Sequence, residues 1–152
     1  MQPIDHFGTN GFGAQPQDFE MFDMLDLSEQ CRVISAGMEA AVLERLAKDV
    51  LNVPLLTLVK SLKLAPSTVQ RRLKGGRDDS RLSPAESDRV ARVLIILKIA
   101  RDLFGDDKRA VEWIKRPLAP LGHKRPIEML DTQPGYDRVR DVLLHASEGV
   151  MA

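Results

Sequence analysis

Apolar positions recur at helical spacing along most of this chain. From about residue 39 to residue 51 they mark one face of a helix, at Leu43, Leu46, Ala47, Val50 and Leu51. Alternation of apolar and polar residues, which would indicate β-strands, is nearly absent. The pattern therefore predicts an all-helical fold.

Two shorter helical patterns follow, separated by a tight break. The first begins near Pro54, which suits a first helical turn because proline has no N–H to leave unpaired. Its buried stripe consists of Leu55, Leu58, Val59 and Leu62. After Lys63-Leu64-Ala65, Pro66 opens a third helix that ends at Gly75-Gly76. Short helices with this connection predict a helix-turn-helix domain, to which we assign residues 28–81.

The longest helical pattern extends from Ser83 to Gly105. Ser83, Pro84 and Glu86 form a strong helix start, and Gly105 suits the left-handed residue that ends a helix. Apolar residues wrap most of its surface, with one face formed by Val90, Val93, Leu94, Leu97, Ala100 and Phe104 and others covered by Ile95, Ile96, Ile99 and Leu103. We expect burial on more than one side, either at the centre of a small bundle or because the helix also forms an interface.

Three further helices are predicted after Gly105. Asp106 or Asp107 can cap a helix that contains Trp113 and stops before Pro117. A connection rich in proline and glycine, residues 117–126, leads to a short helix at 127–130. Thr132 precedes a last helix whose inner face carries Val139, Val142, Leu143 and Ala146, and residues 147–152 are expected to be extended or mobile.

The N-terminal residues lack a comparable pattern. We expect residues 1–17 to be a flexible tail, within a flexible acidic segment 1–27. Phe19, Phe22 and Met24 to Leu27 could form a short helix that docks on the body of the protein or on a partner. The Gly8-x-x-Gly11-x-Gly13 spacing is similar to phosphate-binding loops, but no strand precedes it and no capped helix follows. We do not expect it to bind phosphate.

Charge is distributed unevenly in this neutral chain. Residues 1–40 contain seven acidic and one basic side chain, a net charge of −6, whereas residues 41–82 contain nine basic and four acidic ones, a net charge of +5. The basic segment indicates an anionic partner, or else an ordinary solvated helix face.

The sequence gives little support to an enzyme. His6, His123 and His145 are scattered, Cys31 is the single cysteine, and no motif has metal-ligand or nucleophile spacing, so we expect no catalytic residues, metal or cofactor.

One cysteine excludes an intrachain disulfide and favours a reducing compartment. The start has no signal-peptide pattern, and the longest apolar run, Val93 to Leu97, is far short of the roughly 20 residues that span a bilayer. We expect a soluble, cytoplasmic protein.

The third predicted helix places DNA-binding residue types on one face. These are Ser67, Gln70, Arg71 and Lys74, at i, i+3, i+4 and i+7, while Val69 and Leu73 point into the core. Arginine suits guanine, glutamine suits adenine, and serine and lysine suit phosphates. Thr68, Arg72 and Arg77 could add phosphate contacts. A single small DNA-binding domain binds weakly, so specific binding would require a dimer and two half-sites.

Two positions depart from the usual motif. Many helix-turn-helix motifs have glycine in the turn where Lys63 stands, and an apolar residue where Arg72 stands. These departures keep open an interaction adaptor that no longer binds DNA. Trp113 is expected to be a core anchor, or else an interface anchor.

From about Ile34 to Gly149 the chain resembles the Xre/MbcA/ParS family of antitoxins, which belong to RES–Xre toxin–antitoxin modules. The resemblance rests on the order and spacing of four segments, at residues 82–89 (LSPAESDR), 100–106 (ARDLFGD), 110–117 (AVEWIKRP) and 121–130 (LGHKRPIEML). The acidic N-terminal segment is not part of this pattern.

The resemblance implies that residues 82–152 bind and silence a RES-domain toxin, an enzyme that consumes NAD⁺. It also implies that the N-terminal half binds the operon's promoter and regulates transcription, and that the chain forms a homodimer. The residues it implies in toxin binding are Trp113, Arg116, His123, Lys124, Arg125, Ser147, Glu148, Gly149, Val150, Met151 and Ala152. The final helix and tail would cover the toxin's NAD⁺ pocket, with Glu148 or the terminal carboxylate meeting basic groups.

A stand-alone transcription regulator is the alternative to an antitoxin. In that interpretation no toxin exists, and the C-terminal half only dimerises or senses a ligand. A neighbouring gene for a RES-type enzyme would favour the antitoxin.

Overall fold

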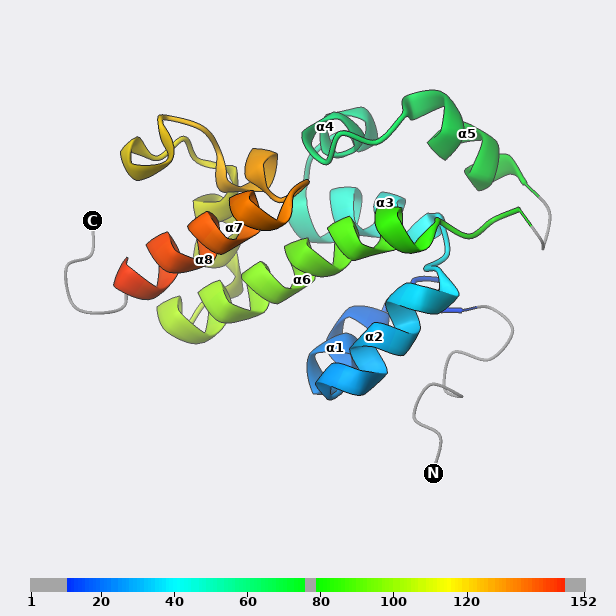
Figure 1. Cartoon of the computed structure of the whole chain (residues 1–152), viewed down its shortest axis with the longest axis horizontal. Coiled ribbons are helices and arrows are strands. Elements are labelled where there is room, and N and C mark those ends of the chain that lie inside the picture. Colours follow the sequence, from blue (N-terminus) through cyan, green and yellow to red (C-terminus); the bar gives the residue numbers. More distant parts are fainter. Residues whose placement is uncertain (1–10, 76–78, 147–152) are drawn as a thin grey trace. The chain divides into compact units, whose positions relative to one another are not determined.

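The computed structural model describes residues 11–75 and 79–146, and these residues are helical with no sheet, which confirms the all-α prediction (Figure 1). Their only β-pairing consists of isolated bridges between Glu39 and Arg81 and between Leu118 and Lys124. The chain divides into two compact units, residues 1–91 and 92–152, so the division falls inside the long helix α6.

The helices of the first unit begin with α1 (Asp18–Met24) and α2 (Leu27–Ala36) and continue through α3 (Ala41–Arg45), the π-helical η2 (Leu46–Leu51), α4 (Leu55–Ser61) and α5 (Pro66–Lys74). The helix α6 (Pro84–Phe104) starts in the first unit and ends in the second. The second unit adds α7 (Asp107–Lys115), the 3₁₀ turns η3 (Ala119–Leu121) and η4 (Pro126–Met129), and α8 (Gln133–Ala146).

Residues 11–27 are ordered into the first unit, which corrects the expectation of a flexible segment for this stretch; residues 1–10 lie outside the described residues. Phe12 and Phe22 are buried and their rings meet edge to face, with centroids 5.3 Å apart. The buried carboxylate of Asp18 accepts hydrogen bonds from the backbone N–H groups of Gly13, at 2.7 Å, and Gln15, at 3.1 Å. Aromatic burial and a satisfied carboxylate together stabilise this stretch.

The predicted helix near residues 39–51 forms as α3 followed directly by η2. Leu43, Leu46 and Leu51 are fully buried, as the periodicity indicated, and Val50 is half-buried. The helix ends at Asn52, whose left-handed backbone (φ 55°) is one that asparagine tolerates better than most residues.

The start and end of α6 match the sequence-based expectation. The Ser83 hydroxyl accepts a hydrogen bond from the Glu86 N–H at 3.1 Å, and the Glu86 carboxylate accepts one from the Ser83 N–H at 2.8 Å. Gly105 follows the last residue with φ 71°. The capping box and the left-handed glycine define both ends of the longest helix.

Most of the apolar surface of α6 is buried within the chain itself. The buried side chains are Val90, Ala91, Val93, Leu94, Ile96, Leu97 and Ala100, and Phe104 is half-buried. The apolar surface of α6 that remains partly exposed is therefore smaller than expected. It is one stripe, formed by the half-buried Ile95 and Ile99 and the 38% exposed Leu103. Their i, i+4, i+8 spacing puts these three side chains on one face.

In the second unit, α7 begins as predicted, because the Asp106 carboxylate accepts a hydrogen bond from the Lys108 N–H at 3.1 Å. Thr132 similarly accepts from the Gly135 N–H at the start of α8. Val139 and Leu143 of α8 are fully buried. None of the helices in the described ranges has the length and apolar character needed to cross a membrane.

Candidate functional site

Two short helices, α4 and α5, are joined by the turn Leu62–Ala65, as the sequence predicted (Figure 1). The turn is closed by hydrogen bonds from the Lys63 N–H to the Lys60 carbonyl, at 3.1 Å, and from the Leu64 N–H to the Val59 carbonyl, at 3.0 Å. Lys63 has φ 58°, the left-handed conformation in which glycine carries no steric cost. Lys63 therefore differs from the usual glycine only in its side chain. Its backbone has the left-handed conformation that glycine commonly adopts in such a turn.

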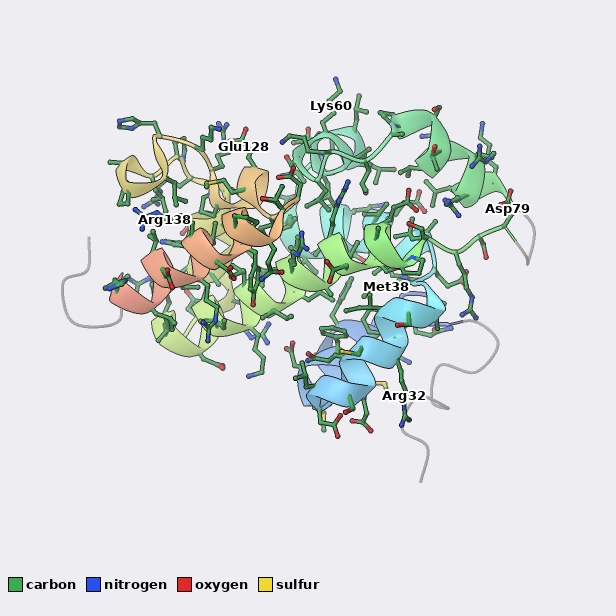
Figure 2. The ribbon with its side chains drawn as sticks, viewed as in Figure 1. Arg32, Met38, Lys60, Asp79, Glu128 and Arg138 are labelled. Carbon is green, nitrogen blue, oxygen red and sulfur yellow. The ribbon has the colours of Figure 1, made fainter. Side chains whose placement is uncertain are left out.

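The predicted face of α5 is exposed. Its residues Ser67, Gln70, Arg71 and Lys74 are all exposed, Thr68 is half-buried, and Arg77 lies outside the described residues. On the opposite side Val69 is buried and Leu73 is half-buried. On α4, Lys60 extends away from the helix (Figure 2). The exposed face combines positive charge with hydrogen-bonding side chains, which suits an anionic partner.

Arg72 does not belong to this face, which corrects the expectation that it could contact phosphate. Its Nη1 donates to the Arg81 carbonyl at 2.5 Å, and its Nε lies 3.5 Å from the Glu86 carboxylate. The side chain is half-buried and turns toward the start of α6. An arginine replaces the usual apolar residue here because a carboxylate and a backbone carbonyl are available beside it.

A basic loop between α7 and η4 forms the second candidate surface. The bridge between Leu118 and Lys124 closes it, and Gly122 and His123 at its tip have φ values of 66° and 63°. The side chains of Arg116, His123, Lys124 and Arg125 are all exposed. Arg138 of α8 donates from Nη2 to the Pro120 carbonyl at 3.1 Å and so ties the loop to α8 (Figure 2). Four of the predicted toxin-binding residues are thus exposed in the same loop between α7 and η4.

Trp113 lies within the second unit, with 9% of its surface exposed. Its ring packs against Phe104, with centroids 6.3 Å apart, and the Arg109 guanidinium lies 6.0 Å from the Phe104 ring centre. In the isolated chain Trp113 is therefore a core anchor that fixes the end of α6 on α7.

The remaining predicted toxin-binding residues, Ser147 to Ala152, lie outside the described residues. They follow directly after Ala146, the last residue of α8.

An exposed apolar surface lies at the corner between α1 and α2, in the segment for which the sequence left docking on the body or on a partner open. Met24 is 84% exposed and Leu27 is 77% exposed, and Asp23 and Asp26 are their neighbours in the sequence. The sequence shows large apolar residues among acidic ones in this segment. Only the folded structure shows which of these apolar side chains remain exposed to solvent. Phe22, in the same segment, is fully buried.

Metal-binding chemistry has no candidate in the part of the chain that the structure describes, where no group of three or more His, Cys, Asp or Glu side chains is gathered as a metal ion requires. Cys31 is exposed on α2.

Comparison with known proteins identifies the C-terminal part of the chain. The family model of the antitoxin Xre/MbcA/ParS C-terminal toxin-binding domain matches residues 100–149, which include α7, the basic loop and α8. The antitoxin Xre of Yersinia enterocolitica is 39% identical over 75 residues, which are 49% of this chain and 51% of that protein. The antitoxin Xre of Photorhabdus laumondii is 38% identical over 68 residues, 44% of this chain and 46% of that protein.

A more distant relative is matched over nearly the whole chain. The Prs ADP-ribosylating antitoxin of a Sphingobium strain is 24% identical over 153 residues, 95% of this chain and 94% of that protein. The chain spans about half the length of the Xre relatives that it matches.

Within this helical chain, residues 100–149 thus match the C-terminal toxin-binding domain of Xre/MbcA/ParS antitoxins, and the Xre relatives support the same likeness.

Proposed function

We propose that this protein is an antitoxin that neutralises a RES-domain toxin encoded by a neighbouring gene and also binds promoter DNA to regulate its own operon. The match of residues 100–149 to a toxin-binding domain carries the first part of the proposal. ADP-ribosylation uses NAD⁺, so the name of the Sphingobium relative agrees with a partner that acts on NAD⁺. We place the protein in the cytoplasm, where it would meet both the toxin and DNA.

In this proposal residues 82–152 bind the toxin. The basic loop with Arg116, His123, Lys124 and Arg125 contacts the toxin surface, and the tail from Ser147 to Ala152 blocks its NAD⁺ pocket. Trp113 contributes by holding α7 in place, since its ring is packed in the unit. The mechanism is steric, and the antitoxin itself performs no reaction.

Deleting residues 147–152 tests the blocking role of the tail. We expect the shortened protein to bind the operator normally but to protect cells poorly, because the toxin's pocket is left open. Growth of cells that co-express toxin and antitoxin measures protection, and co-purification measures whether the complex still forms. A truncated antitoxin that protects as well as the full chain would remove the tail from the mechanism.

DNA binding is assigned to residues 28–81, through the exposed face of α5. Arg71 and Lys74 are exposed and at i, i+3 spacing, so two phosphate or base contacts are available there. The operator would be read by a homodimer, since one short helix makes few base contacts.

Replacing Arg71 and Lys74 with alanine tests this assignment. We expect weaker operator binding and a slope of log affinity against log salt that is shallower by about 2, because two cations no longer displace counterions. Fluorescence anisotropy over a range of salt concentrations measures both. Lys108→Ala, an exposed lysine on α7, is the control and should leave the slope unchanged. Equal affinity and slope in wild type and double variant would favour an adaptor that does not bind DNA.

A further inference from the structure

Arg89 of α6 binds the turn that precedes α5. Its Nη1 donates to the carbonyl oxygens of Leu62, at 3.2 Å, and Lys63, at 3.0 Å, and the side chain is half-buried. Hydrogen bonds from a guanidinium are charge-assisted and stronger than neutral ones. The turn is thus attached to a helix that lies more than twenty positions later in the chain.

The carbonyls that Arg89 binds belong to the strained part of the turn. Lys63 has a left-handed backbone, which costs about 1–2 kcal/mol for a residue with a Cβ. A strained conformation persists only when neighbouring groups hold it. Arg89 supplies such a restraint, because it bonds the carbonyl of Lys63 itself and the one before it.

The other end of α5 is also held by α6. Arg72 lies in the last turn of α5, and its guanidinium meets the Glu86 carboxylate in the first turn of α6. Between Glu86 and Arg89, the buried Ser87 hydroxyl accepts a hydrogen bond from the Met38 N–H at 2.8 Å. The first two turns of α6 therefore hold α5 near both of its ends and anchor to the body of the first unit.

We propose that Arg89 is a positioning residue for base reading by α5. This inference rests on the proposed DNA-binding function and names a residue outside the DNA-facing surface. Base-edge hydrogen bonds require donors and acceptors within a few tenths of an ångström, whereas phosphate contacts by long cations tolerate displacement. Loss of the Arg89 restraint therefore lowers discrimination between operator and random DNA while leaving non-specific affinity nearly unchanged.

The chain offers a matched control three positions later. Arg92 is also half-buried on α6, and its Nη1 donates to the Leu130 carbonyl at 3.0 Å, inside the second unit. Arg89→Gln and Arg92→Gln thus remove the same charge and the same type of backbone hydrogen bond, but only the first affects the turn before α5.

The experiment compares full-length wild type, both variants and Arg89→Lys on the operator and on a scrambled duplex of equal length. We expect Arg89→Gln to lower the ratio of operator to scrambled affinity about tenfold, the size of one lost base contact. Affinity for the scrambled duplex should change by less than about twofold, since the phosphate contacts remain. Arg92→Gln should keep the wild-type ratio, and Arg89→Lys, which retains one donor, should recover part of it.

Amide hydrogen exchange supplies a readout that does not need DNA. We expect faster exchange at Lys63 and Leu64 in Arg89→Gln and unchanged exchange at these amides in Arg92→Gln. Unchanged exchange in Arg89→Gln, or an equal loss of affinity for both duplexes, would overturn the positioning role. If wild type itself shows no sequence preference, the DNA-reading function fails first, and the positioning role with it.

Discussion

Lys63 has a residue type that its backbone conformation does not favour. Residues with a Cβ adopt a left-handed backbone only at a cost in free energy, yet an exposed lysine stands at this position. The cation lies in the turn directly before the DNA-binding candidate α5. The Lys63 ammonium donates a hydrogen bond to the Ser61 carbonyl at 3.4 Å.

Lys63→Gly is expected to raise the free energy of unfolding by about 0.5–1 kcal/mol. The glycine removes the left-handed strain but loses more conformational entropy on folding, so the gain is smaller than the strain itself. Urea unfolding followed by circular dichroism measures the change. Lys60→Gly, at an exposed position inside α4, should instead lower stability by about 1 kcal/mol. Destabilisation by both substitutions would contradict the strain at Lys63.

Arg72 and Arg89 illustrate what residue types alone leave undecided. From the sequence, Arg72 could contact phosphate, whereas Arg89 was part of the segment 82–89 and had no assigned role. In the structure their guanidinium groups bind backbone carbonyls and, for Arg72, a carboxylate. Their acceptors lie far along the chain or on the backbone, so no pattern in the sequence indicates these bonds.

At the scale of elements, the helices with local start and stop signals were the predictable ones. The capping box at Ser83 and Glu86, the cap at Asp106 and the left-handed Gly105 all formed as expected. These signals depend on neighbours within four residues, so they act in the same way in any tertiary setting.

The N-terminal segment was harder to predict, because its order depends on contacts with α3. An added Cβ on Gly13 would stand 2.6 Å from the Val42 Cβ, and Gly13 has φ 101°. Glycine therefore allows residues 11–17 to pack closely on α3, a role that the sequence spacing did not reveal.

Gly13→Ala is expected to lower the free energy of unfolding by about 2–3 kcal/mol, because it adds both backbone strain and a steric clash. Gly105→Ala is the matched control. It has φ 71° but no atom within 4 Å of the added Cβ, so it should cost only the backbone strain, about 1–2 kcal/mol. Chemical denaturation of both variants measures the difference. A Gly13→Ala protein as stable as wild type would mean that residues 11–17 do not pack on α3 in solution.

At the scale of the whole molecule, the apolar stripe on α6 is the surface we propose for the homodimer. Ile95, Ile99 and Leu103 share one face and remain partly exposed after folding. Burying these side chains against a second copy would remove apolar surface from water, which favours association.

Leu103→Glu is expected to weaken self-association by about tenfold or more, because a charge would enter an apolar contact. Sedimentation equilibrium measures the dissociation constant. Leu144→Glu, a similarly exposed leucine on α8, is the control and should leave self-association unchanged. A wild-type protein that remains monomeric, or a Leu103→Glu protein that dimerises normally, would exclude the stripe as the dimer interface.

The sequence by itself determined the helical fold, most helix ends, the outward face of α5 and the resemblance of the C-terminal part to Xre/MbcA/ParS antitoxins. These features rest on periodicity and caps within a few residues, and on the order of four short segments along the chain. Only the tertiary structure decided that residues 11–27 pack into the first unit, that α6 hides most of its apolar surface, and that Arg72 and Arg89 hold α5 in place. Each of these depends on which distant backbone groups and side chains become neighbours, and a linear pattern does not contain that information.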